Sequence, residues 1–311
     1  MKKRYINLLI IIICILFLIE FIINRTLIFD TVGFSLNIWI NSIFPSLFPF
    51  FIISDILNSY NIINYIPNII KNIFKKLFNI SDNALFIFFI SMLSGFPSNS
   101  RNIKILYKEN KISISEAEHL LFFTHFSNPM FILGALVVIF LNNKSLGLLI
   151  LLSHYIPNFI IAILLRKYNN PKHNYIINNS NNCSNFGIIF TKSIKSSIDS
   201  LLLICGTLTV FLIISTIIIN TLKLNTINNL LIKSILEITS GLKEMSTINF
   251  NNSTLVILSS CILSFGGLSV HMQVINELTE TDISYKNFFI GRIFQTILSL
   301  IISYIICLFT F

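Results

Sequence analysis

Charged side chains are scarce in this sequence of 311 residues: they make up 11% of it, whereas hydrophobic residues make up 54%. A soluble domain usually carries about 25% charged residues, because its surface has to face water. The shortage therefore excludes a water-soluble globular fold for most of the chain.

Cysteines are few and widely separated, which excludes both a disulfide framework and a zinc site built from closely spaced cysteines. The five are Cys14, Cys183, Cys205, Cys261 and Cys307. We interpret them as packing residues, and we expect no metal and no cofactor.

Short motifs of common enzyme classes are missing too. The sequence has no G-x-S-x-G, no H-E-x-x-H and no glycine-rich phosphate loop that ends in Lys-Ser or Lys-Thr. We therefore expect no enzymatic activity, and keep an intramembrane pair of Asp55 and Asp199 as a distant alternative.

Long apolar blocks are what the sequence has instead. A helix needs roughly 20 apolar residues to cross a bilayer core about 30 Å thick, and most of the blocks approach or reach that length. Their unbroken Ile, Leu and Phe runs exclude the alternating pattern of a membrane β-barrel. We therefore predict an all-α, polytopic membrane protein. The blocks cover residues 6–23, 36–57, 84–92, 119–141, 146–165, 201–219, 254–263 and 288–309.

Basic residues outnumber acidic ones by 22 to 13, which gives a formal net charge of +9. They occur in short loops between apolar blocks, where they orient a membrane protein, and not as a cluster that could line nucleic acid. We therefore expect a lipid bilayer and no nucleic acid as partner; a homo-oligomer stays open. Because no cleavage site follows the first block, we predict an uncleaved helix over residues 1–29.

The polar, Asn-rich stretch 167–185 divides the remaining chain into two parts that resemble each other. Residues 84–113 align with 255–284 without a gap, so that Gly95 meets Gly266. This alignment predicts two repeats, residues 30–166 and 186–311. If 36–57 and 201–219 each enter and leave on one side of the membrane, the repeats are inverted.

That arrangement places most basic loops on the cytoplasmic side, as orientation rules require. It also makes residues 255–276 run outward. Lys71, Lys75 and Lys76 then lie on the outer side, on an interfacial helix.

Four interruptions break the apolar helices. They are Ser94-Gly95-Phe96-Pro97-Ser98-Asn99, Ser127-Asn128-Pro129, Thr239-Ser240-Gly241 after Glu237, and Gly266-Gly267-Leu268-Ser269. Proline removes a backbone donor and glycine permits unwinding, so these stretches free backbone groups inside the membrane. Secondary transporters bind substrates at such breaks, often with helix N-termini directed at anionic groups.

The candidate substrate-binding residues lie at or near these breaks: Ser94, Gly95, Pro97, Ser98, Asn99, Arg101, Asn128, Glu237, Thr239, Ser240, Gly266, Gly267, Ser269 and His271. Structural alternatives stay open for several of them. Glycine and proline also kink or pack membrane helices. Asn128 could cap a helix, Arg101 could be an orientation anchor, and His271 could be a packing residue. Glu237 could lie at the membrane interface, although an intramembrane carboxylate is a functional candidate by default.

Five motifs in this order resemble the YlbJ-type (SpoVV) sporulation integral membrane proteins: SLFPFFIISDIL, SGFPSNSR with LYKENKISISEAEHLL, SNPMFILGAL, LEITSGL and GGLSVHMQV. This family belongs with the nucleoside-recognition Gate domain proteins, which are distantly similar to concentrative nucleoside transporters. Two positions depart from the family pattern: Asn99 replaces a glycine, and Asn128 stands where glycine or serine precedes the proline.

The resemblance implies a protein of the outer forespore membrane that moves dipicolinic acid from the mother cell toward the forespore. On this hypothesis Arg101 and the amides near Ser98 and Ser269 hold the two carboxylates, and Glu237 is a proton or gating partner. The alternatives are a carrier of nucleosides or other metabolites, and a membrane scaffold for spore assembly that transports nothing.

Overall fold

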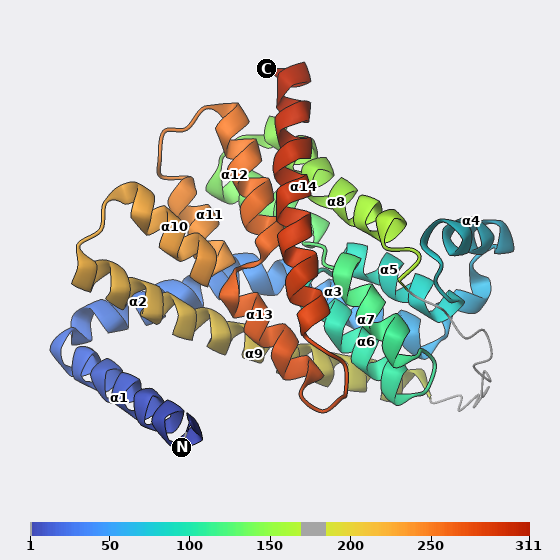
Figure 1. Cartoon of the computed structure of the whole chain (residues 1–311), viewed down its shortest axis with the longest axis horizontal. Helices are drawn as coiled ribbons and strands as arrows, with labels where there is room; N and C mark the ends of the chain where they lie inside the picture. Colours follow the sequence, from blue (N-terminus) through green and yellow to red (C-terminus); the bar gives the residue numbers. More distant parts are fainter. Residues whose placement is uncertain (1, 169–184) are drawn as a thin grey trace.

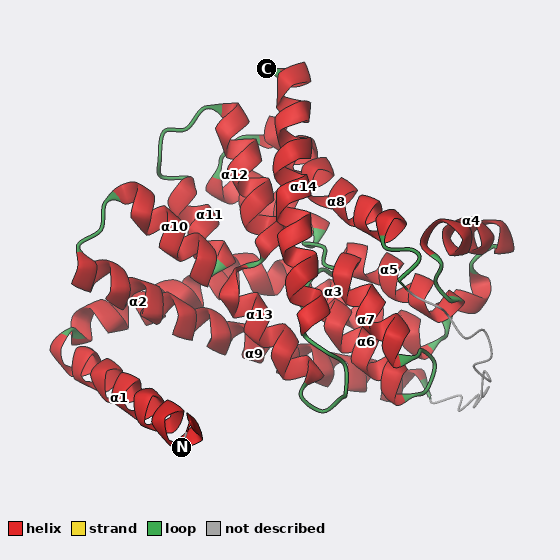
Figure 2. Cartoon of the chain, viewed as in Figure 1, coloured by secondary structure: helices red, strands yellow, loops and turns green. Residues whose placement is uncertain are grey.

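The computed structural model describes residues 2–168 and 185–311, and within them the chain is helical with no strand (Figure 2). The prediction of an all-α, polytopic membrane protein is confirmed, because six of the described helices are long and apolar enough to cross a bilayer. Most of the predicted loop 167–185, with Cys183, lies outside the described residues.

The elements, in chain order, are α1 (Lys2–Ile23), α2 (Arg25–Ile38), η1 (Trp39–Ile43), α3 (Phe44–Ser59), η2 (Ile62–Tyr65), α4 (Asn68–Phe78), α5 (Asp82–Ser94), α6 (Ser98–Lys108), α7 (Ile114–Phe123), η3 (Phe131–Phe140), η4 (Lys144–Leu146), α8 (Gly147–Leu164), α9 (Phe186–Leu222), α10 (Thr226–Leu236), α11 (Ile238–Met245), α12 (Asn252–Phe265), α13 (Gly267–Leu278) and α14 (Lys286–Thr310).

Two long helices pack side by side along the long axis of the molecule (Figure 1). One is continuous over Arg25–Ser59 and comprises α2, the π-helical η1 and α3; the other is α9. They run antiparallel, since Ser35 Oγ lies 2.8 Å from Thr209 Oγ1 and Trp39 Nε1 donates to the Leu201 carbonyl at 3.0 Å.

The prediction that 36–57 and 201–219 are re-entrant is therefore wrong, because each lies within one continuous helix. Pro45 stands in the first turn of α3, where its missing N–H is tolerated, and the wider turns of η1 come just before it. Pro49 lies inside α3 without ending it.

The first re-entrant hairpin is instead α5–α6. The start of α5 and the end of α6 lie together, because the Asn83 side chain donates to the Lys111 carbonyl at 2.9 Å. Ser81 caps α5, and Gly95 ends it with φ +75°, a conformation that favours glycine. With 13 residues, α5 is too short to cross a bilayer, so the chain turns back at the predicted break.

A second hairpin is formed by α10 and α11. Its arms are joined by the ion pair between Lys233 and Glu244 at 2.7 Å. They approach so closely at Gly241 that an added Cβ would lie 2.5 Å from the Ser234 Cα. Glu237, in extended conformation, forms the tip.

Two further helices are interrupted but continue across the molecule. The first consists of α7 and η3, separated by the unwound residues 124–128; the second consists of α12 and α13, separated by Gly266 with φ +88°. The four predicted breaks all lie at or directly beside interruptions, two as hairpin tips and two within crossing helices. The third is displaced, because Thr239-Ser240-Gly241 is part of α11 and the interruption itself is at Glu237.

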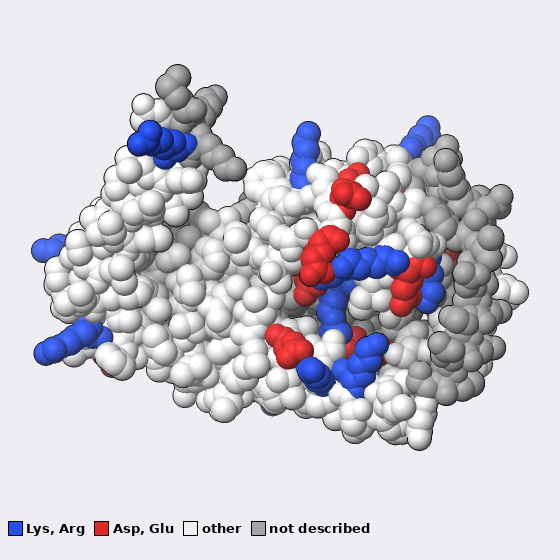
Figure 3. Space-filling model, turned by 90° about the horizontal axis from the view of Figure 1, so that it is seen from below, with Lys and Arg blue, Asp and Glu red and all other residues white. Residues whose placement is uncertain are grey.

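Charged side chains gather on one face of the molecule (Figure 3). Here the end of α6 meets the end of α13, because Lys104 and Lys108 pair with Glu280 at 3.3 and 2.7 Å, and Lys104 also lies 3.6 Å from Glu277. The start of α14 lies here too, where the Ser284 amide donates to Glu118 of α7 at 3.0 Å. We call this side the charged face.

The opposite side, the far face, holds the base of the second hairpin. Lys243 of α11 lies over the Phe140 ring at the end of η3, 5.4 Å from its centroid. The start of α12 is beside the same region, since the Asn143 side chain donates to Asn252 at 3.3 Å. The α7–η3 helix therefore runs from the charged face to the far face, and α12–α13 runs back.

These directions correct two predictions. The alignment of 84–113 with 255–284 pairs a hairpin with a crossing helix, and 255–276 runs toward the charged face rather than away from it. Lys75 of α4 also lies near the charged face, because it pairs with Asp82 at the base of the first hairpin at 2.8 Å. Both corrections have the same cause. The Arg25–Ser59 helix continues across instead of turning back, so each later element starts from the side opposite to the predicted one.

Candidate functional site

All four helix breaks converge on one small cavity between the two long helices. Its volume is about 40 Å³, enough for a few water molecules, each of which needs at least about 10–15 Å³. The lining residues come from both hairpin tips, both interrupted helices, α9 and the Arg25–Ser59 helix: Ile43, Leu47, Phe96, Ser127, Asn128, Phe131, Ile204, Leu208, Glu237, Ile238, Thr239, Ser269, Val270 and Gln273. We call it the central cavity.

Predicted glycines hold the breaks against one another. A Cβ on Gly95 would lie 2.7 Å from the Asn128 backbone nitrogen, so the first hairpin tip touches the first interrupted helix. A Cβ on Gly267 would lie 3.0 Å from the Ile238 nitrogen, so the second tip touches the second interrupted helix. Contacts this close leave no space for a side chain, which explains the choice of glycine at both positions.

Asn128 joins three elements in the cavity wall. Its side-chain oxygen accepts from the amides of Met130 and Phe131 at 2.6 and 3.2 Å, which caps the start of η3. Its side-chain nitrogen donates to the carbonyls of Leu93 and Ser46 at 3.0 and 3.1 Å. The side chain is therefore both a cap and a cross-link, and it borders the central cavity as well.

Glu237 is buried at the tip of the second hairpin, with 2% of its surface exposed. One carboxylate oxygen accepts from the Ser240 amide at 2.6 Å, which makes Glu237 the N-cap of α11. A carboxylate at a helix N-terminus is stabilised by the free amides and by the helix dipole. Glu237 and Thr239 both line the central cavity.

Ser269 offers the one lining hydroxyl among the described residues that is buried with no hydrogen-bond partner. It lies in the first turn of α13, one turn before Gln273, whose amide nitrogen donates to Thr207 at 2.8 Å. A buried hydroxyl without a partner lowers the stability of the fold unless a ligand or a water molecule supplies a hydrogen-bond partner.

Several predicted residues support the tip of the first hairpin without lining the cavity. Ser94 and Ser98 hydrogen-bond to each other, Ser98 also donates to the Gly95 carbonyl at 2.6 Å, and Pro97 directly precedes α6. Asn99 is buried and donates to Thr124 at 3.4 Å.

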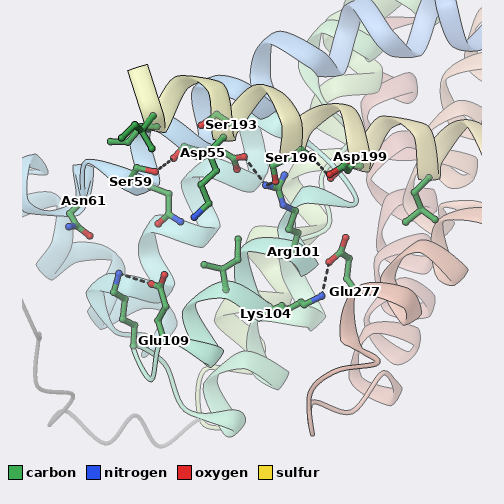
Figure 4. Close-up of a pocket in the computed structure, with 18 of the residues that line it drawn as sticks. Asp55, Ser59, Asn61, Arg101, Lys104, Glu109, Ser193, Ser196, Asp199 and Glu277 are labelled. Carbon is green, nitrogen blue, oxygen red and sulfur yellow. Dashed lines mark hydrogen bonds and ion pairs between the residues drawn. The ribbon is translucent and has the colours of Figure 1, made fainter. Parts of the chain in front are cut away.

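His271 and Arg101 do not reach the central cavity. His271 is engaged by Tyr285 and by the Phe265 carbonyl, the latter at 3.0 Å, which supports the packing alternative. Arg101 points into a second, wider cavity, where it pairs with Asp55 at 2.7 Å and hydrogen-bonds to Ser196 (Figure 4). A single anion therefore cannot bind Arg101 and Ser269 together in this conformation.

This wider cavity, which we call the vestibule, has a volume of about 840 Å³. Charges of both signs line its wall, four basic and four acidic, several of which are labelled in Figure 4: Asp55, Arg101, Lys104, Glu109, Lys111, Lys192, Asp199 and Glu277. Asp55 and Asp199, the distant enzymatic alternative, both line it, but the Asp55 carboxylate is already paired with Arg101.

The vestibule and the central cavity follow each other along the same helices. On α9, Leu203 lines the vestibule and the next residue, Ile204, lines the central cavity. On α13, Glu277 lines the vestibule, and Gln273, one turn before it, lines the central cavity. Phe51 of α3, with 1% exposure, belongs to one buried apolar cluster with Leu201 and Ile204, and it stands one turn before Asp55 on the same helix. We call this cluster the Phe51 plug.

Sequence reasoning missed two of the six polar residues that line the central cavity, Ser127 and Gln273. Ser127 stood inside a predicted break but was not selected, and Gln273 and Thr207 gave no local signal because they lie in regular helices. Asp55, the partner of Arg101, lies 46 residues away in sequence.

Comparison with known proteins adds evidence of a different kind. The Gate family profile, described as nucleoside recognition, matches residues 40–144, which include the first hairpin and the first interrupted helix. The sporulation integral membrane protein YlbJ of Bacillus subtilis (strain 168) is 29% identical, over 86% of this chain and 74% of YlbJ. This chain resembles the YlbJ-type sporulation membrane proteins. The resemblance carried by the five motifs is thereby confirmed, while no solved structure matches.

The chain is therefore an integral, multi-pass membrane protein with a Gate segment, and this organisation indicates a transporter-like role rather than a known enzyme class. The site offers helix N-termini, buried amides and, among the described residues, one lining hydroxyl without a partner, all around one small cavity.

Proposed function

We propose that this protein is a secondary transporter or facilitator that carries a small organic anion, dipicolinate, from the mother cell toward the forespore. The observation that carries the proposal is the convergence of two hairpin tips and two helix interruptions on one central cavity. Transporters bind substrates where interrupted helices release backbone groups near the middle of the membrane. By resemblance, the membrane is the outer forespore membrane.

Inverted repeats within residues 30–166 and 186–311 remain part of the proposal. Each part contains a long helix, a hairpin, an interrupted helix and a further helix in that order. The first hairpin has its base at the charged face and the second at the far face. Two such units in opposite orientation around one site would permit alternating access.

We assign the charged face to the cytoplasm of the mother cell. It carries Lys104, Lys108 and Lys192, which lie near helix ends, and the positive-inside rule places basic residues close to the ends of membrane helices there. The vestibule is then the entrance for the substrate, and Arg101 is the first cation that an entering carboxylate meets. Release of Arg101 from Asp55 would accompany opening of the Phe51 plug.

In the central cavity, the amides at the starts of α11, α13 and η3 supply partial positive charge. Glu237 would repel a dianion if it stayed charged, so we retain it as the proton or gating partner. A coupled proton would neutralise it when the substrate enters.

A nucleoside carrier is the second candidate, and a specific observation favours it. The central cavity is lined by one carboxylate and, among the described residues, by no cation, which suits a neutral solute rich in hydrogen-bonding groups. The nucleoside-recognition description of the Gate profile agrees with this chemistry.

The test is uptake into vesicles that contain the purified protein, with labelled dipicolinate and with unlabelled nucleosides as competitors. Ser269→Ala removes a hydroxyl that has no internal partner, so it should raise KM about two- to tenfold without loss of folded protein. Ser260→Ala is the matched control, because that hydroxyl is also buried and without a partner but does not line the cavity.

In a sporulating strain that lacks the protein, dipicolinate should accumulate in the mother cell and fail to load the forespore. Normal loading of the forespore would refute dipicolinate as substrate. Nucleoside uptake by the vesicles would then establish the second candidate, and uptake of neither would leave a scaffold role.

A further inference from the structure

The largest fully buried side chain among the described residues is Arg292, on α14, which sequence reasoning did not select. It has 0% exposure and forms no ion pair with a carboxylate of the residues that the structure describes. A buried cation is costly unless other groups compensate its charge. What compensates Arg292 therefore indicates what it does.

One of its partners is the end of α7, and the others lie on α14 itself. The terminal Nη2 donates to the Phe122 carbonyl at 2.9 Å, and the guanidinium lies over the Phe288 ring, 5.1 Å from its centroid. Phe122 is the penultimate residue of α7, where the carbonyls have no helical donor and carry the negative end of the helix dipole. Arg292 thus compensates the C-terminal end of an interrupted helix.

Gln295, one turn further along α14, continues this role. It hydrogen-bonds to Arg292, and its amide nitrogen donates to the His125 carbonyl at 3.3 Å. From α8, Asn158 donates to the same carbonyl at 2.6 Å, and Tyr155 donates to the Ser127 carbonyl at 2.9 Å.

Two further backbone groups of the unwound residues are also engaged from outside. The Ser127 amide donates to His154 Nε2 at 2.8 Å, and the Phe126 carbonyl accepts from the Phe96 amide at 2.9 Å. An unwound backbone inside a membrane persists only where such partners replace the helical hydrogen bonds. The unwound residues end in Ser127 and Asn128, which line the central cavity.

We infer that Arg292 and Gln295 are positioning residues that hold residues 124–128 unwound and so place Ser127 and Asn128 at the substrate site. The consequence for transport rests on the proposed function, but the structural role does not. Arg292 acts from α14 through the end of α7 and touches no lining residue directly in the hydrogen bonds that the structure shows.

Amide hydrogen exchange of the purified protein in lipid nanodiscs tests the structural role. Arg292→Met keeps much of the side-chain length but loses the charge and the donors. It should increase the exchange rate of peptides that cover 122–131 at least about tenfold. Peptides of the second hairpin should not change, and Arg292→Lys should restore part of the protection. Lys286→Met is the matched control, since it removes an exposed charge from the same helix.

Unchanged exchange at 122–131 in Arg292→Met would overturn the inference, and so would a uniform increase over the whole chain, which shows general destabilisation. If exchange rises locally while wild-type vesicles transport neither dipicolinate nor nucleosides, the proposed function fails and the positioning role stands. Where wild type transports, the same variant should raise KM about tenfold, and an unchanged KM would also overturn the inference.

Discussion

Gly95→Ala is the substitution for which the structure predicts the clearest effect. Gly95 has φ +75° and ψ −174°, a region that is nearly restricted to glycine and costs other residues about 1–3 kcal/mol. The new Cβ would also lie 2.7 Å from the backbone nitrogen of Asn128. Because backbone cannot yield as a flexible side chain can, this overpacking adds about 1–3 kcal/mol.

Together the two effects lower the free energy of unfolding by about 2–6 kcal/mol, a large part of the 5–15 kcal/mol typical of a folded protein. Gly267→Ala should cost less, because its nearest atoms lie at 3.0 and 3.3 Å. Gly206→Ala is the control: nothing lies within 4 Å of its Cβ, and alanine favours a helix interior by about 0.5–1 kcal/mol.

The assay is unfolding of the purified variants in one detergent, followed by tryptophan fluorescence and by retention of a monodisperse peak. The expected order of stability is Gly206→Ala, wild type, Gly267→Ala and then Gly95→Ala. If Gly95→Ala is as stable to unfolding as Gly206→Ala, the tip of the first hairpin does not contact the first interrupted helix. That result would refute the geometry of the central cavity.

Three further predictions concern charges and caps. Asp55→Asn and Arg101→Gln should each destabilise the protein, because each breaks the ion pair between these residues. A double-mutant cycle in unfolding experiments should give a coupling energy of about 1.5–3 kcal/mol, and additive effects would show that the ion pair does not form. Asn128→Ala should lower the unfolding free energy by about 1–3 kcal/mol and abolish uptake, whereas retained uptake would exclude the side chain from the site. Hydrogen bonds from Lys108 lower the pKa of exposed Glu280. The contribution of Glu280 to the free energy of unfolding is therefore present at neutral pH and is lost as the pH falls below the ordinary pKa range of Glu. Wild type and Glu280→Gln should therefore differ in melting temperature at neutral pH and converge in acid, and an equal difference at both would exclude this bridge.

Local chemistry made part of the site predictable. Gly95, Gly266 and Pro97 mark breaks wherever they stand in an apolar helix, because their effect on the backbone depends on no distant residue. Glu237 was selected for the cost of a carboxylate inside a membrane and Asn128 for its place in a break, and both border the cavity.

The same local chemistry could not distinguish a hairpin tip from a kink. The prolines of the Arg25–Ser59 helix suggested a re-entrant turn, yet the π-helical turns of η1 precede them and the helix continues. Arg101 stands only one turn beyond a break, and its direction was decided by Asp55 and Ser196 on two other helices.

The amino-acid sequence alone determined that this chain is helical and membrane-embedded, and where its helices break, because segment length, apolar content and the backbone chemistry of glycine and proline are local properties. Tertiary structure decided which breaks become hairpins, which face each helix end reaches and which side chains meet. Those outcomes depend on partners such as Arg292 and Phe122, which lie 170 residues apart and meet only when α14 packs against α7.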